Sequence, residues 1–586
     1  MSTRHAPSPT PSPRRGAGRP DRPRFDRWLG LVLLGTLLLG CSTTGAPTKP
    51  PSPDADAGSA VVVKPLNIGL FDEPPALGSK FSGGGTGRAD YSFLFAAKLI
   101  QYDSHGSPMA VLATEPPSLE KGTWRLLDDQ RMETTYTLRK ATFQDGSPFT
   151  ADDVAFTWRL IMNPDLPAED HEPEKFIDSI EVLDPQTFVV HWRETYVFAN
   201  AWDLEPLPKA IFGPLVDRDV QAFTNTSAWT RDWVGLGPYR VTDWVQGTYL
   251  KGQAFDGFVL GKPKIRDIVV NFVQDANQAV SRMLAGTLDI TLGNLIRGDE
   301  GLVLKEQMEA RGDGSVLTIP TKIRYGELQY REPRPPPSRD VRVRQSLLHA
   351  LDRAQLVEAL LHGLSTMADM YLAPNDAAFP AADKVIAKYP YDPNRAATLL
   401  QDAGWTRGDE GVLRNSTGER FDLELRTTEE TQNQKEVQII ADAWKAVGIN
   451  PSVEIVPKAK QNDQEYRAKY PGIGFSATSI QADWLSKWQT ELIASEANRW
   501  RGGNRGAYSR PEFDAMYRQY ITTVDPVERQ AVLVALVKFA SEDVTYLPLY
   551  YQIDVHAIRA GLKGVEPRWP GQPGMAFNAY QWYWAG

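Results

Sequence analysis

Apolar residues along the chain recur with two periods, one typical of strands and one typical of helices. Short runs rich in β-branched and aromatic residues predict strands at Val61–Leu70, Thr135–Arg139, Phe188–Trp192, Arg240–Thr242, Ile268–Phe272 and Val453–Val456. Longer segments predict helices at Tyr91–Ile100, Val341–Leu351, Arg353–His362, Pro393–Gly404, Val437–Val447 and Val527–Ser541, and one that starts after Thr150. Strands alternate with helices in both halves, which indicates the α/β class.

Local stop and start signals support these assignments. Asp145-Gly146 is a tight-turn signal, and Thr150 with Asp153 three residues later is a variant of the capping box. Asp392 followed by proline predicts a helix start. Gly363, Gly404 and Gly448 predict helix ends.

A separate apolar run, Leu31–Gly40, precedes Cys41, which is the single cysteine. The run is shorter than the roughly 20 residues that a membrane-spanning helix needs. Its length and the arginines before it are typical of a signal peptide. Leu38-Leu39-Gly40-Cys41 resembles the lipobox of bacterial lipoproteins, which implies cleavage before Cys41 and lipid attachment to it. The alternative is a buried core cysteine behind a short hydrophobic helix.

Residues 41–60 are rich in Ser, Thr, Pro, Gly and Ala and have little to bury, so we expect a flexible tether there. The chain has 586 residues and a formal net charge of −9. Its length predicts two or more domains. Its negative charge argues against a nucleic-acid partner. With one cysteine, an internal disulfide or a zinc–thiolate site is excluded.

Signals for catalysis are weak. The seven histidines are scattered, and the sequence has no HExxH, no GxSxG and no P-loop. Gly83–Gly87 is glycine-rich, but we interpret it as a loop because no Lys-Ser/Thr follows. Carboxylates are plentiful, and no spacing singles out an acid/base pair. We therefore expect a binding protein without a metal or cofactor.

Eight blocks then resemble one family, in order, over nearly all of the chain after the tether. They are Gly106–Ala113, Tyr136–Val154, Gly235–Tyr239, Leu284–Asp289, Asp340–Arg353, Tyr391–Trp405, Tyr508–Asp514 and Tyr546–Tyr550. These blocks resemble the solute-binding proteins of bacterial ABC importers, extracellular family 5, which take up peptides, nickel and related ligands.

The resemblance implies a two-lobed periplasmic-binding-protein-like fold (type II, cluster C), with an extra subdomain inserted in lobe I and the ligand held between hinged lobes. The expected boundaries are a signal peptide at 1–40, a tether at 41–60, lobe I at 61–105, 235–324 and 545–586, the inserted subdomain at 106–234, and lobe II at 325–544.

The resemblance also implies a ligand site. In peptide binders of the family, an aspartate in an Ala-Asp-aromatic stretch pairs with the α-ammonium of the ligand. Asp483 occupies that position, followed by Trp484. The alternative is an exposed loop aspartate. Asn504 lies in a segment that would line the cleft, or serves as a turn asparagine. Trp488 and Trp500 could stack on ligand or belong to the core.

The predicted function is a monomeric, lipid-anchored, extracytoplasmic receptor on the periplasmic side or the cell surface. It would deliver an oligopeptide to the permease of an ABC importer. The alternatives are an oligosaccharide or nickel-chelate ligand, a sensory receptor, and a lipoprotein hydrolase. Saturable binding without product would separate a receptor from an enzyme.

Overall fold

The computed structural model describes residues 64–81, 88–128, 130–168, 173–331, 339–461, 463–480, 482–571 and 574–585, without the side chains of Ser79, Arg88 and residues 482–484. The predicted signal peptide, Cys41 and the tether lie outside these residues, as do Val61–Val63 and the Gly83–Gly87 loop. None of the helices in the described ranges is long and apolar enough to cross a membrane.

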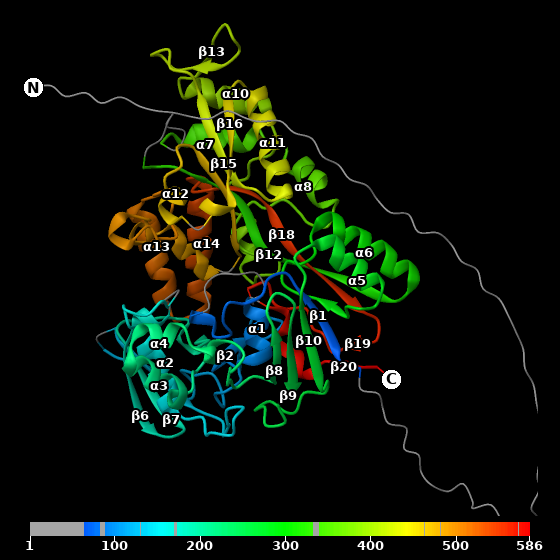
Figure 1. Ribbon diagram of the computed structural model, residues 1–586. Coiled ribbons are helices and arrows are strands. Elements are labelled where there is room, and N and C mark those ends of the chain that lie inside the picture. Colours follow the sequence, from blue (N-terminus) through cyan, green and yellow to red (C-terminus); the bar gives the residue numbers. More distant parts are fainter. Residues whose placement is uncertain are drawn as a thin grey trace, which may run out of the picture. The chain divides into compact units, whose positions relative to one another are not determined.

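One large mixed sheet organises the described chain (Figure 1). Its ten described strands lie in the order β16-β15-β17-β12-β18-β11-β1-β10-β9-β8. Their bounds are β1 Leu66–Leu70, β8 Tyr239–Val245, β9 Tyr249–Ala254, β10 Asp267–Phe272, β11 Ile290–Thr291, β12 Gly314–Leu328, β15 Asp422–Thr428, β16 Asn450–Val456, β17 Ile473–Ser479 and β18 Leu547–Arg559. We call β1 with β8–β11 the first half-sheet and β15–β17 the second half-sheet; β12 and β18 connect them.

The connecting strands pair with each other in antiparallel fashion and differ in their outer neighbours. β18 contacts the first half-sheet through Ile558, opposite Ile290 of β11. β12 pairs with the second half-sheet from Lys322 onward, where Lys322 lies opposite Ser479 of β17. The β12–β18 register shifts between Pro320 and Lys322, which leaves Thr321 as a bulge. Because a bulge bends its strand, the bend falls where β12 changes its neighbour.

The sequence pattern predicted neither β12 nor β18. Pro320 interrupts the β12 pattern, and a proline cannot donate to a strand ladder; the adjacent bulge accommodates it. Strand β18 begins in the segment Tyr546–Tyr551, which follows the last predicted helix, and continues to Arg559. Asp554 and His556 break its apolar run, but both side chains are buried.

A four-stranded sheet, β4-β5-β7-β6, lies between β3 and β8 in the sequence. Its strands are Trp124–Leu126, Met132–Thr137, Thr187–Trp192 and Ile177–Asp184. Helix α2 (Ala151–Ile161) starts as predicted, because Thr150 is its N-cap and the Asp153 carboxylate accepts the Thr150 N–H at 2.9 Å.

Two of the blocks that suggested the family pack against each other. The Gln144 amide, beside the Asp145-Gly146 turn, donates to the carbonyls of Gly237 (3.1 Å) and Tyr239 (2.7 Å). A Cβ at Gly235 would lie 2.2 Å from the Phe95 carbonyl oxygen, so only glycine fits there. These motifs therefore hold the smaller sheet to the main sheet.

The predicted helix at Tyr91–Ile100 is too long. Helix α1 covers Arg88–Phe95, and Ile100–Tyr102 is strand β2, paired with β3 (Pro108–Ala110). The indole N–H of Trp233 donates to the Phe95 carbonyl at 3.0 Å, so a tertiary contact satisfies the carbonyl at the helix end.

The remaining described helices and short strands connect and cover the sheets. They are α3 Lys209–Arg218, α4 Val220–Thr224, α5 Ala276–Leu284, α6 Gly298–Arg311, α7 Val341–His349, α8 Arg353–Leu361, α9 Phe379–Ala382, α10 Pro393–Asp402, α11 Thr431–Ala446, α12 Gln464–Ala468, α13 Pro511–Thr522, α14 Pro526–Glu542, β13 Thr406–Arg407, β14 Leu413–Arg414, β19 Leu562–Lys563 and β20 Tyr583–Trp584. One core packs α7, α8, α10 and α11 against the second half-sheet, and another packs α13 and α14 against β12 and β18.

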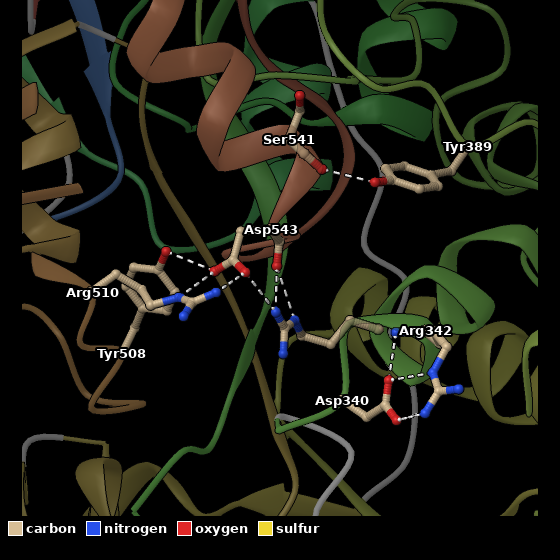
Figure 2. Close-up of polar contacts among 8 residues, drawn as sticks. Asp340, Arg342, Tyr389, Tyr508, Arg510, Ser541 and Asp543 are labelled. Carbon is tan, nitrogen blue, oxygen red and sulfur yellow. Dashed lines mark hydrogen bonds and ion pairs between the residues drawn. The ribbon is translucent and has the colours of Figure 1, made fainter. Parts of the chain in front are cut away.

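The carboxylate of Asp543, after α14, joins three segments (Figure 2). Arg344 of α7 donates to the Asp543 side chain at 3.0 Å and to its carbonyl at 2.6 Å. Tyr508 Oη donates to the carboxylate at 2.9 Å, and Arg510 at 2.7 Å. Asp340 caps α7 by accepting the Arg342 N–H at 2.9 Å. The blocks Asp340–Arg353 and Tyr508–Asp514 therefore have structural roles.

Candidate ligand-binding site

Strand directions fix where the two half-sheets meet. β11 and β12 run the same way, because both are antiparallel to β18. β17 runs against β12 and ends at Ser479, opposite Lys322. The carboxyl ends of β11 and β17, and of the strands parallel to them, therefore point to the same stretch of β12, which we call the crossing (Thr321 and Lys322). Ligands of open α/β sheets bind outside the carboxyl ends of the strands, at a point where the strand order changes.

Four polar side chains from different segments meet at the crossing. Arg568, from the C-terminal segment, donates to Asp554 of β18 at 2.6 Å. Asn294, in the loop after β11, donates its amide to the other oxygen of Asp554 and accepts from Lys322 Nζ at 3.3 Å. Asn294 has a φ of +34°, a conformation that asparagine tolerates better than most residues. The cluster therefore joins both connecting strands to the end of the first half-sheet.

Charge around Lys322 is predominantly positive. Burial lowers the pKa of Lys322. The nearby charges of Arg568, Arg297 and Arg324 also lower it, whereas the charge of Asp554 raises it. Burial alone would raise the pKa of Asp554, but Arg568, His556 and Lys322 together hold it below its usual value. Asp554 is thus ionised at neutral pH. The Lys322 residue as a whole is only partly buried.

Two further buried acid–base groups flank the crossing. His556 Nδ1 lies 3.1 Å from the Thr291 carbonyl, and its Nε2 has no partner among the described residues. Burial lowers the pKa of His556 to about 4, so the ring is neutral at pH 7. Asp90 of α1 accepts the Ala576 N–H at 2.9 Å, and burial raises its pKa to about 6.

A buried ion pair fixes β12 just beyond the crossing. The Arg324 guanidinium donates to both oxygens of Glu436 on α11, at 3.0 Å for Nε. Tyr550 Oη of β18 donates to the same carboxylate at 2.6 Å. Both charges are almost fully buried and satisfied by hydrogen bonds, which is the condition under which such a pair is stable.

The segment that carries Asp483 is anchored on the opposite face of β12. It forms a 3₁₀ helix, η6 (Ala482–Trp488), that begins shortly after β17 ends. Lys487 Nζ donates to Glu327 at 3.2 Å and to the Gly503 carbonyl at 3.0 Å. The side chains of Asp483 and Trp484 lie outside the described parts, so their ligand-binding roles stay predictions.

The structure gives Asn504 and Trp488 internal contacts. The Asn504 amide donates to the carbonyls of Tyr508 (2.7 Å) and Gln489 (3.1 Å), and its oxygen accepts the Tyr508 N–H at 3.0 Å. Asn504 is 0% exposed, and Trp488 is 1% exposed. The Trp488 ring stacks on Tyr546 at 5.3 Å between centroids. These contacts fit the alternatives of a turn asparagine for Asn504 and a core residue for Trp488. Ligand contact by either residue stays a prediction.

Trp500 lies apart from this core and is partly exposed. Its backbone has a φ of +61°. The Lys469 ammonium is 4.7 Å from the centre of its ring, and the Arg331 guanidinium carbon is 5.5 Å away. Cations stacked on an indole are favourable, and they leave Trp500 next to a basic surface.

Sequence reasoning missed Asn294, Lys322, Asp554 and Arg568. A signal existed in β18, where two ionisable residues interrupt the run Ile553–Ala557, since charges in an apolar strand usually have partners. Their convergence could not be predicted, because it depends on the register of two strands far apart in sequence.

No three His, Cys, Asp or Glu side chains of the described chain gather closely enough to hold a metal ion. The site defined above is instead a crossing of charged groups between two half-sheets. This arrangement is that of a ligand-binding α/β protein.

Solved structures share the fold. An oligopeptide-binding protein from Thermus thermophilus, complexed with a pentapeptide, superposes with a TM-score of 0.73 at 24% identity, covering 89% of this chain and 96% of that one. NikZ from Campylobacter jejuni, in complex with Ni(L-His), gives 0.72 at 21% identity, covering 88% and 99%. The two-lobed binding-protein fold predicted from the sequence is thereby confirmed.

Sequence comparison gives the family. The oligopeptide-binding protein AppA of Bacillus subtilis (strain 168) is 25% identical over 548 residues, 91% of this chain and 94% of AppA. Residues 114–490 match the bacterial extracellular solute-binding proteins, family 5 (middle region). The chain belongs to this family of ABC-importer substrate-binding proteins, whose members are extracytoplasmic and bind solutes rather than convert them.

Proposed function

We propose that the protein is a lipid-anchored receptor that captures a peptide-like solute at the crossing and delivers it to the permease of an ABC importer. The observation that carries this proposal is the convergence of both sets of carboxyl strand ends on Lys322, a partly exposed residue within a region rich in arginines. Such a group suits a carboxylate or carbonyl of a ligand. The peptide-binding relatives favour a peptide over other solutes.

Asp483 is the proposed partner for the other end of the peptide. A carboxylate and an α-ammonium form a charge-assisted hydrogen bond when water is excluded. Asp483 follows the end of β17 by four residues, so its place in the chain is close to the crossing. Hinge motion at the bent connecting strands would allow the lobes to close over the solute.

The first experiment is mass spectrometry of whatever copurifies with the native protein. Recovered peptides support the proposal, whereas recovered oligosaccharides or metal chelates contradict its solute class. For a recovered peptide, we expect Asp483→Ala to weaken binding by about tenfold or more in calorimetry. The N-acetylated peptide is the matched control and should bind both forms equally. Unchanged affinity of Asp483→Ala for the free peptide would refute the role of Asp483.

The lipid anchor is proposed at Cys41, on the basis of its position after the apolar run. We expect Cys41→Ser to abolish incorporation of labelled fatty acid and to shift the protein from the membrane to the soluble fraction. A single acyl chain binds membranes only marginally, so the wild-type anchor should carry more than one. Label retained in the serine variant would contradict the assignment.

A further inference from the structure

A group of arginines without carboxylate partners lies beside the far end of β12. Arg331 Nη1 donates to the Ala468 carbonyl at 3.0 Å and to the Arg505 carbonyl at 3.5 Å. Because Arg331 Nη1 contacts both carbonyls, the end of α12 lies next to the turn at residues 503–506. Arg467, which precedes Ala468, and Arg505 are therefore neighbours.

Neither side chain has a partner within the described residues. No acceptor lies within hydrogen-bonding or ion-pair distance of the Arg467 guanidinium in that part of the chain, and the buried Nε of Arg505 is likewise unpaired there. The Tyr470 hydroxyl is buried without a partner among the same residues, and Tyr470 is only 4% exposed. Both arginines are partly exposed, so a solute can reach them. Native structures rarely leave such groups unsatisfied.

Nearby acids are already engaged. Glu327 accepts from Lys487 at 3.2 Å and from the Gly506 N–H at 2.9 Å. Glu465 pairs with Lys469 at 2.7 Å. Burial and the charge of Arg505 lower the pKa of Arg467 to about 10, which shows how poorly the site compensates this cation. A cation removed from water without a counter-charge is unfavourable. Among the described residues, the site lacks an anion that is free to pair with these arginines.

We propose that Arg467 and Arg505, with the Tyr470 hydroxyl, form a subsite for a carboxylate of the transported solute. This inference rests on the proposed function and narrows it to solutes that carry an acidic group. Guanidinium groups bind carboxylates in a bidentate manner, and a phenol hydroxyl adds a third donor. Trp500 borders the subsite through Arg331 and Lys469.

The length of β12 sets the size of a solute that would contact both the crossing and the subsite. From Lys322 to Glu327 the strand extends about 17 Å, at roughly 3.3 Å per residue. An extended peptide of about five residues spans that distance. The bound carboxylate can therefore come from the carboxyl terminus or from an acidic side chain.

The test is retention of peptides from two randomised pentapeptide libraries, one with a free and one with an amidated carboxyl terminus. Retained peptides are sequenced by mass spectrometry for the wild type, Arg467→Gln, Arg505→Gln and Tyr470→Phe. Lys458→Gln, an exposed cation on the segment that precedes α12, is the matched control. If the subsite binds acidic side chains, we expect the wild type to enrich acidic peptides from both libraries. If it binds the carboxyl terminus, we expect the wild type to retain peptides from the library with the free terminus alone. Either enrichment should fall about tenfold or more in the arginine variants and less in Tyr470→Phe, without change in the control.

If peptides are retained without preference for a carboxylate, the subsite is overturned and the proposed function is left intact. The same holds if the preference is unchanged in both arginine variants. If no peptide is retained, the proposed function fails. In that case the subsite is tested by adding glutarate and measuring the Tm. Glutarate should raise the Tm of the wild type but not that of the double variant Arg467→Gln/Arg505→Gln. An unchanged Tm of the wild type would overturn the subsite. Ligand-free Arg467→Gln should melt at the same or a higher temperature, because it removes an uncompensated cation. A lower Tm would assign Arg467 a structural role and contradict the proposal.

Discussion

At the scale of single residues, buried charges define the crossing. Asp554 pairs with Arg568, whose positive charge helps to hold the pKa of Asp554 below its usual value. Asp90 and His556 are shifted in opposite senses, because burial favours the neutral form of each: the acid of Asp90 and the base of His556. Their effects on stability should therefore oppose each other over the same range of pH.

The sign for each group follows from linkage. His556 has its pKa lowered from 6.5 to about 4, so its contribution is present above pH 6.5 and is lost as the pH falls towards 4. Asp90 has its pKa raised from 3.8 to about 6, so its contribution is present below pH 3.8 and is lost as the pH rises through 6. Each effect amounts to about 3 kcal/mol, at about 1.4 kcal/mol per pKa unit.

We expect Asp90→Asn to lose stability more steeply than the wild type between pH 6.5 and pH 4. His556→Asn, which keeps a donor near the Thr291 carbonyl, should gain stability relative to the wild type over the same range. Denaturant titrations at several pH values measure both differences. Parallel pH profiles for all three proteins would contradict the burial of these groups.

At the scale of elements, capped helices and glycine turns could be predicted, because their signals are local. Thr150 with Asp153 predicted the start of α2, and Asp392-Pro393 that of α10. Strand β12 could not be predicted, since Pro320 violates the strand pattern and is tolerated only beside the Thr321 bulge. The end of α1 depends on Trp233, a residue far away in the sequence.

Asn504 is an element-scale test of the loop that supports η6. Because its amide satisfies several buried carbonyls, Asn504→Ala should lower the free energy of unfolding by about 2–3 kcal/mol without any ligand. Chemical denaturation of the ligand-free protein measures the loss. Glu512→Ala, an exposed change at the start of α13, is the control and should have little effect. A stable Asn504→Ala variant with weakened ligand binding would instead support direct ligand contact.

At the scale of the whole molecule, the family blocks predicted the fold, but the side chains at the crossing needed the structure. Eight short blocks suffice for the fold because they encode turns, caps and packing contacts, as the Gln144 and Asp543 contacts show. Lys322, Asn294, Asp554 and Arg568 come together only through the register of β12 against β17 and β18. The identity of the solute depends on such side chains, so a shared fold does not determine which solute binds.

We propose that a solute binds between the carboxyl ends of both half-sheets and leaves unaltered. A retained pentapeptide with a photoreactive benzophenone side chain at its centre tests it directly, by cross-linking and peptide mapping. We predict cross-links both to the loop after β11 (residues 292–297) and to the ends of β15 or β17 (residues 428–430 or 479–480), with the unreacted peptide recovered intact. Cross-links confined to one half-sheet would contradict binding between the half-sheets, and recovery of a cleaved peptide would contradict release of an unaltered solute.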